Sequence, residues 1–222
     1  MTILNWFFRP LKFVRYEDSY ASCRQFLWPM LLTAIAKQQS DGFSVLLVAH
    51  FAQTFTSVQD LLENSGMDYQ IVDRSVAAND FMNFSSLELS TVQLSLSHLL
   101  EPSEKVSREA SVDRPISMIM VERHPLPQHD CRALAFAKGL QGPTRFGYYL
   151  AIDDVVVRRA VNDTTVVVLK QLGLKDHDLI TSNLISRRLE KVLDREASQY
   201  AQDLPADSAQ EWYRRNEVRL VR

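Results

Sequence analysis

The chain has 222 residues and a mass of 25.5 kDa, which allows one large domain or one domain with an appendage. Its net charge of −2 provides no global positive field, so a nucleic-acid partner is not expected. Only two cysteines are present, Cys23 and Cys131, which form no disulfide framework and indicate a reducing compartment. The N-terminus does not read as a cleavable secretory signal, so we expect a cytoplasmic protein.

Residues 1–41 are predicted to form an N-terminal arm followed by a helix. The stretch NWFFRPLKFVRY mixes aromatic residues with the bases Arg9, Lys12 and Arg15, as in segments that lie at a membrane interface. Pro10 interrupts any continuous amphipathic helix, which favours an arm that packs on its own domain or on a partner. The alternative is peripheral contact of residues 4–16 with the inner face of the cell membrane.

A helix is predicted from Tyr20 to Gln39. Pro29 marks its start or a kink, and Gly42 is expected to end it. The apolar run FLWPMLLTAIA within it is too short to span a bilayer.

Residues 42–155 are predicted to form an α/β domain with a mainly parallel sheet and flanking helices. FSVLLVAH is a continuous apolar run, typical of a parallel strand that is buried on both faces. A helix follows, with Thr56 or Ser57 as its cap and Gly66 as its end. The polar stretch Glu101–Pro115 is predicted to be an exposed loop. The predicted strands are Val45–Ala49, Gln70–Val72, Val92–Ser95, Ile116–Val121 and Tyr148–Ile152.

Residues 156–222 are predicted to form a helical tail. Its apolar residues recur at helical spacing, and this stripe should be buried against the α/β domain or another helix. Asp203, Pro205 and Asp207 interrupt the pattern, and SAQEWYRRNEVRLVR is predicted to be a last helix. The stripe comprises Leu179, Ile180, Leu184, Ile185, Leu189, Val192 and Leu193.

Four pieces of the sequence, which follow one another in the family's order, resemble the SecA family, the ATP-driven motor of bacterial preprotein translocation. One of them is the stretch Val121–Asp154, which contains two matching motifs. VERHPLPQHD and the later YYLAIDD resemble the family's ERHxxxxID and FYLSLED. SVLLVAHFAQTFTSVQDLLENSGMDYQIVD, LKQLGLKDHDLITSNLISRRLEKVLDREA and VRYEDSYAS resemble other segments of the same family. The matched motif residues, expected to be structural, are Glu122, Arg123, His124, Asp130, Pro143, Asp153 and Asp154. The resemblance implies a RecA-like second motor lobe over residues 42–155, followed by the start of a helical scaffold.

The residues with which such a motor binds and hydrolyses ATP are missing. No GxxxxGK[ST] phosphate cradle is present, and Gly139, Gly142 and Gly147 are not followed by Lys-Ser/Thr. The family's arginine-rich QLRGRAGRQGD aligns with RALAFAKGLQG, which places Leu134, Phe136 and Gly139 where arginines stand.

Lys138, Arg132 and Glu104 remain as candidates for residual nucleotide contact. Lys138 and Arg132 are displaced from the arginine positions by at least one residue, which is about 100° of rotation on a helix. Glu101 and Glu104 align with an arginine and an aspartate of another nucleotide-facing element, and a carboxylate there would repel phosphate. We therefore expect no catalytic or nucleotide-binding residues and no cofactor.

Other groups of reactive residues were weighed against structural roles. His124, His129, Asp130 and Cys131 lack the spacing of common zinc sites, so no metal is expected. His50 and His98 follow strand-like runs, and local hydrogen bonding is favoured over a catalytic role. No group is seen that would orient His129 toward Cys131 as a base, and Asp153–Asp154 is expected to cap a helix.

Two functions follow from these expectations. The first is a non-catalytic SecA-like interaction or scaffold protein, linked to protein translocation. Its partner would be a motor chain, a secretory component or a second copy of itself. The alternative is the second half of a split motor, which completes an ATP site with a separate chain that carries the phosphate cradle. In that case Lys138 or Arg132 would supply the cation that stabilises the transferring phosphoryl group, and ATP would be the cofactor.

Overall fold

The computed structural model describes residues 13–81, 90–103, 115–161 and 178–216. Its centre is an eight-stranded sheet in the order β10-β2-β9-β8-β3-β6-β4, with β1 also paired to β9. All of these pairs are parallel except that of β10 with β2. The strands are β1 (Phe13–Arg15), β2 (Ser19–Ala21), β3 (Ser44–Ala49), β4 (Tyr69–Val72), β6 (Val92–Leu96), β8 (Ile116–Met120), β9 (Thr144–Ala151) and β10 (Ile180–Thr181).

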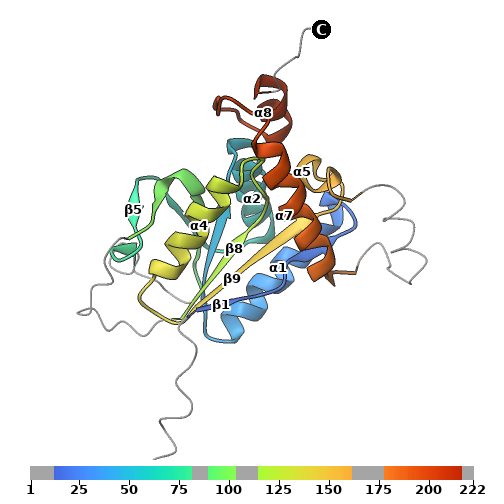
Figure 1. Ribbon diagram of the computed structural model, residues 1–222. Helices are drawn as coiled ribbons and strands as arrows, with labels where there is room; N and C mark the ends of the chain where they lie inside the picture. Colours follow the sequence, from blue (N-terminus) through green and yellow to red (C-terminus); the bar gives the residue numbers. More distant parts are fainter. Residues whose placement is uncertain (1–12, 82–89, 104–114, 162–177, 217–222) are drawn as a thin grey trace, which may run out of the picture.

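Helices cover both faces of this sheet (Figure 1). α1 and α2 pack on one face, and α4 and α7 pack on the other. The helices are α1 (Arg24–Ser40), α2 (Ala52–Ser65), α4 (Pro127–Gly139), α5 (Val155–Arg158), α7 (Asn183–Ala197) and α8 (Ala209–Asn216). A small second sheet pairs β5 (Val76–Ala77) with β7 (Leu100–Glu101). The predicted α/β class, with a mainly parallel sheet and flanking helices, is confirmed.

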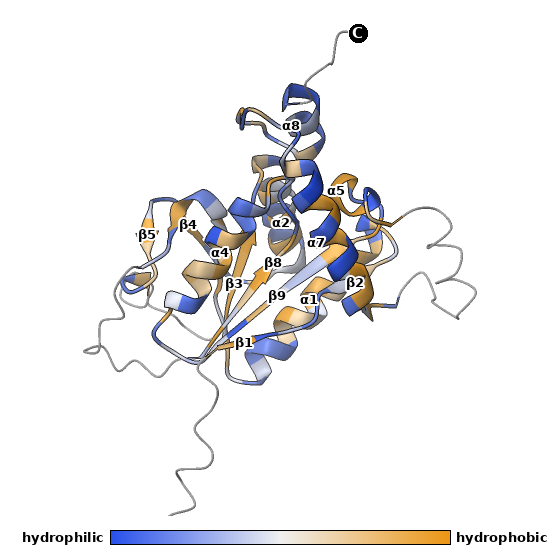
Figure 2. Cartoon of the chain, viewed as in Figure 1, coloured by the Kyte–Doolittle hydropathy of each residue, from blue (hydrophilic) through white to orange (hydrophobic). Residues whose placement is uncertain are grey.

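Side-chain alternation along the strands divides the core into two layers. Leu46 and Val48 of β3 face the layer that holds α4 and α7, whereas Val45 and Leu47 face α1 and α2. All four side chains are fully buried, and each contributes roughly 1.5–3 kcal/mol on burial. Figure 2 shows β3 and β8 largely in hydrophobic colours, β9 in paler ones, and α7 largely in hydrophilic ones.

All five predicted strands are present, and so are both predicted glycine helix ends. Gly66 ends α2 at φ 68°, and Gly42 follows α1 at φ 84°, a backbone region that favours glycine. The predicted start of the first helix was wrong. Tyr20 lies in β2, and α1 begins at Arg24 and runs through Pro29 without ending there.

The predicted cap of the second helix was also wrong. α2 begins at Ala52, ahead of both Thr56 and Ser57, and its N-cap residue Phe51 offers no side-chain acceptor. The cap comes instead from a remote carboxylate, Glu122, whose Oε1 accepts the backbone N–H of Phe51.

The apolar stripe of the tail is only partly buried. Ile185, Leu189 and Leu193 are buried, and Val192 packs against the same core. Leu184 was predicted to be buried but is 79% exposed, because it lies on the outer side of α7. Leu179 and Ile180 precede the helix, and Ile180 lies in β10, where its backbone pairs with β2.

The end of the N-terminal segment belongs to the central sheet. β1 and β2 lie end to end along β9, pairing Phe13 with Thr144 and Ser19 with Tyr149. None of the described helices is both long and apolar enough to cross a bilayer. Predictions for residues 4–12, for Glu104 and most of the polar loop, for residues 169–177 and for residues 217–222 lie outside the described residues.

Candidate functional site

The site lies at the carboxyl ends of the central strands. The chain places β4 and β6 on one side of β3, and β8 and β9 on the other. The helices that follow β3 and β8, α2 and α4, therefore leave toward opposite faces of the sheet. Ligands of doubly wound sheets bind at such a switch point, outside the carboxyl ends of the strands. Here His50 follows β3, Ser97 follows β6, and Glu122 follows β8.

Glu122 binds the N-terminus of α2. Its Oε1 accepts the backbone N–H groups of His50 at 2.8 Å and Phe51 at 2.9 Å, and its Oε2 accepts the Thr54 hydroxyl at 2.6 Å. The side chain is buried, and burial raises the pKa of this carboxyl. Glu122 thus satisfies N–H groups that the helix itself leaves unpaired.

His50 joins three elements through a buried chain of hydrogen bonds. Its Nδ1 lies 2.8 Å from Ser97 Oγ, and its Nε2 lies 2.8 Å from Asp130 Oδ1 on α4. Burial alone would raise the pKa of Asp130, but Arg123 and His50 together hold it below its usual value. His50 is therefore a locally hydrogen-bonded group, as predicted, while His98 is exposed.

Arg123 is turned into the protein. Its guanidinium lies 4.2 Å from the centre of the Tyr148 ring, and its Nε is 3.5 Å from Asp130 Oδ2. Glu190 of α7 lies 3.7 Å from its Nη2. The side chain is 5% exposed. Burial opposes its charge, yet Asp130, Tyr148 and Asp18 together raise its pKa.

The acidic pair at the end of β9 binds the start of α1. Asp153 Oδ1 accepts the backbone N–H of Arg24 at 2.9 Å, and Asp154 Oδ2 is 2.7 Å from the Arg24 guanidinium. Asp154 is the N-cap residue of α5, as expected, but its side chain makes no cap bond there. Pro143, the remaining motif residue, accepts the N–H of Ile116 through its carbonyl at 2.8 Å, between β8 and β9.

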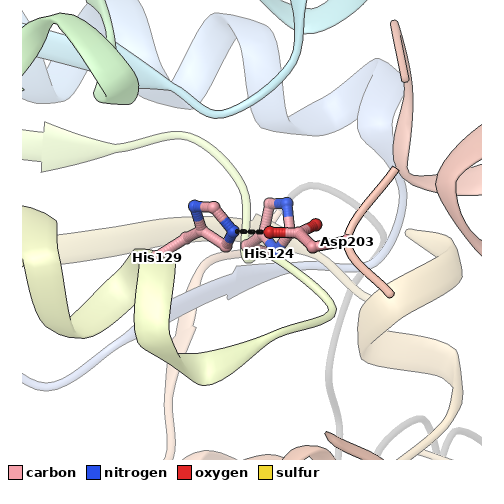
Figure 3. Close-up of side chains that lie close together, drawn as sticks. All are labelled: His124, His129 and Asp203. Carbon is pink, nitrogen blue, oxygen red and sulfur yellow. Dashed lines mark hydrogen bonds and ion pairs between the residues drawn. The ribbon is translucent and has the colours of Figure 1, made fainter. Parts of the chain in front are cut away.

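His124 lies beside the C-terminal segment. Figure 3 shows its ring next to His129 of α4 and Asp203, which precedes α8. Asp203 Oδ2 is 2.7 Å from His129 Nε2, and the two imidazole centres are 3.9 Å apart. Burial, aided by the neighbouring His50 and His129, lowers the pKa of His124 to about 3, so its ring is neutral at pH 7.

The C-terminal segment closes this edge of the sheet. The Trp212 ring packs against His124 with centres 5.6 Å apart, and it is 1% exposed. The backbone N–H of Gln53, in the first turn of α2, donates to the Asp207 carbonyl at 2.9 Å. The C-terminal segment thus covers the part of the carboxyl edge around His124 and the start of α2.

Of the described candidates for nucleotide contact, Arg132 lies near His98, which follows β6, whereas Lys138 lies away from this edge. Lys138 lies in the last turn of α4, and its Nζ is 5.9 Å from the Phe13 ring at the opposite end of the sheet. Arg132 is exposed on α4. Of the positions aligned with family arginines, Phe136 is fully buried against Phe81.

Sequence reasoning missed three residues of the site. Ser97 was not singled out, although its place just after a predicted strand was a usable signal. Trp212 and Asp203 lie far along the chain, and nothing local connects them with His124. Of the four residues weighed for metal, only His124 and His129 meet, because Asp130 binds His50 and Cys131 is exposed.

Comparison with known proteins gives a distant structural likeness and no match in sequence. No protein-family model matches the sequence, and no curated protein matches it either. Among solved structures, the C-terminal part of the Fun30 ATPase domain aligns with 14% identity and a TM-score of 0.40. The alignment covers 77% of this chain and 54%, about half, of that chain. A likeness at this TM-score supports no conclusion about this chain, and the matched protein is not SecA.

Proposed function

We propose that this chain is a non-catalytic interaction protein, built like the second lobe of an ATP-driven motor and linked by its SecA-like motifs to protein translocation. The observation that carries the proposal is that the chain's own residues cover the part of the carboxyl edge around His124. Glu122 binds the start of α2, and Trp212 covers His124 where a ligand of a doubly wound sheet would lie.

The distribution of charge supports this reading. A transferring phosphoryl group needs cations that point at it. At this edge Arg123 is stacked on Tyr148, and Arg24 is paired with Asp154. Glu122 and Asp130 add buried carboxylates, which would repel phosphate.

The outer side of α7 is the face that we assign to a partner. Exposed residues recur there at helical spacing, and Figure 2 shows the helix as largely hydrophilic on this side. Glu190 forms a surface ion pair with Arg15, and the buried Glu196 pairs with Arg159. Within the described part of the chain, none of the four cations on this side has an ion-pair partner. The face consists of Leu184, Arg187, Arg188, Lys191 and Arg195. Such a surface suits an acidic protein face with an apolar spot at one end.

Nucleotide chemistry is tested with pure protein. We expect no release of phosphate from Mg·ATP above background, and no change in melting temperature when Mg·ATP is added. Turnover that falls in Lys138→Ala or Arg132→Ala would contradict the proposal and support a rearranged active site. The split-motor alternative predicts ATP hydrolysis only when a second chain that carries the GxxxxGK[ST] phosphate-binding motif is added.

The partner is tested by purifying the tagged protein from its own cells and identifying the bound chains. We expect a stoichiometric motor or secretory chain that binds wild-type protein and is lost from the double variant Arg188→Glu/Lys191→Glu. Lys37→Glu, on the exposed side of α1, is the matched control. Equal retention by the α7 variant would show that this face is not the one used.

A further inference from the structure

Two histidines and an aspartate from separate segments converge beside the carboxyl edge. His124 follows β8, His129 lies in the first turn of α4, and Asp203 lies between α7 and α8. One nitrogen or oxygen atom from each lies within 4.8 Å of the other two (Figure 3). Asp203 is 74 residues from His129, so the spacing of the sequence could not reveal the group.

Neighbouring side chains hold two of these three groups in place. Asp203 Oδ1 accepts the indole N–H of Trp212 at 2.8 Å, which leaves Oδ2 facing His129. The His124 ring is stacked on Phe51, with centres 5.1 Å apart and planes inclined by 15°. Such outer contacts orient the ligands of protein metal sites.

We propose that His124, His129 and Asp203 bind one Zn²⁺ ion that ties the C-terminal segment to the carboxyl edge of the sheet. Two imidazole nitrogens and one carboxylate oxygen are a ligand set that zinc accepts, with water at the fourth position. His129 is half-buried and Asp203 is exposed, so both the ion and this water can reach the site.

Zinc binding rearranges two hydrogen bonds. The ion replaces the contact between His129 Nε2 and Asp203 Oδ2, since both atoms become ligands. The Leu126 N–H donates to His124 Nδ1 at 3.0 Å, which places the proton of the neutral ring on Nε2. Coordination through Nε2 moves that proton to Nδ1 and breaks the Leu126 bond. The ring then has the protonation state usual for a zinc ligand.

The test uses full-length protein freed of metal by a chelator. Titration with Co²⁺ should give the visible absorption bands of a tetrahedral site and saturate at one ion per chain, and Zn²⁺ should displace the Co²⁺. Mg²⁺ should give no response, because it prefers oxygen ligands. Zn²⁺ should also raise the melting temperature of the wild-type protein.

Variants distinguish this site from adventitious binding. His129→Ala and Asp203→Asn should each lose the Co²⁺ bands, while their melting temperatures in chelator show that they remain folded. Trp212→Phe removes the indole donor and should weaken Zn²⁺ binding by roughly 10- to 100-fold. Cys131→Ala and His98→Ala, both at exposed positions, should bind as wild type. The proposal is overturned if wild-type protein does not bind one ion, or if His129→Ala and Asp203→Asn bind it equally well.

Discussion

At the scale of single residues, carboxylates that follow strands bind the starts of distant helices. Glu122, after β8, binds the N-terminus of α2, and Asp153, after β9, binds that of α1. Neither helix has a side-chain cap of its own. An acid beside these N–H groups also interacts favourably with the helix dipole. Two acids that could have suggested catalysis are thus engaged in structure.

We predict that Glu122→Ala lowers the free energy of unfolding by about 2–4 kcal/mol, since two buried N–H groups and the Thr54 hydroxyl lose their acceptor. Glu122→Gln keeps one acceptor oxygen and should lose less than half as much. Urea unfolding followed by circular dichroism measures both. A loss below about 0.5 kcal/mol for the alanine variant, the size of an ordinary surface substitution, would contradict this role.

The raised pKa of Asp18 predicts how the stability of the folded protein should change with pH. It is 2% exposed, and burial raises its pKa above the usual 3.8, although Arg123, Ser186 and Arg15 lower it in part. Glu190 faces it from α7 and raises its pKa further. A raised carboxyl pKa contributes stability that is complete below the unfolded pKa and is lost as pH rises through the folded pKa.

We therefore predict that Asp18→Asn gains stability over wild type as pH rises from 4 to 7. Each unit by which the pKa is raised corresponds to about 1.4 kcal/mol. Melting temperatures of both proteins across this range measure the difference. A difference that is constant with pH, or that shrinks as pH rises, would mean that the Asp18 pKa is not raised.

At the scale of elements, α7 has two sides with different tasks. Leu189 is fully buried among the residues that face α4, whereas Leu184 is 79% exposed on the outer side. The prediction placed both leucines in one stripe, but five residues of α-helix rotate the side chain by about 140°, so the two lie on different sides of α7. The two leucines therefore provide a matched pair within one helix.

Leu189→Asp should lower the free energy of unfolding by more than about 4 kcal/mol, because it buries a carboxylate in an apolar contact. Leu184→Asp should stay within about 0.5 kcal/mol of wild type, since an exposed acid in the first turn suits the helix dipole. Urea unfolding of both variants is the measurement. Equal destabilisation by both substitutions would show that the outer side of α7 is covered in solution.

At the scale of the whole molecule, one sheet joins segments from the entire described chain. β2, which precedes α1, pairs with β9, and β10, which precedes α7, pairs with β2. The division into residues 1–41, 42–155 and 156–222 stays a prediction. Because these strand pairings join all three ranges in one sheet, we expect the three ranges to unfold together.

We predict a single unfolding transition, reported equally by Trp28 on α1 and by Trp212 on α8. The variants Trp6→Phe/Trp212→Phe and Trp6→Phe/Trp28→Phe each keep one of these reporters. In each variant, fluorescence and circular dichroism should give the same urea midpoint. A separate, earlier midpoint for Trp212 would instead indicate a tail that unfolds independently of the sheet.

The sequence by itself determined the strands of the sheet and the glycines that end its helices. Val45–Ala49 is a continuous apolar run, and Ile116–Met120 is apolar except for Ser117, as is typical of parallel strands that are buried on both faces. Gly42 and Gly66 adopt positive φ, a local property of glycine. The SecA-like motif also singled out Glu122, Arg123, His124 and Asp130, which the fold gathers at one edge.

Only the tertiary structure decided what these residues contact. The caps of α1 and α2, the chain from Ser97 to Asp130 and the meeting of Asp203 with His124 all join residues far apart in sequence. Local spacing carries no signal for such contacts, because they form only when the strands pair and the C-terminal segment folds back over the sheet. The exposure of Leu184 is different, because helical spacing alone places it about 140° around the helix from Leu189 and on the side of Arg188.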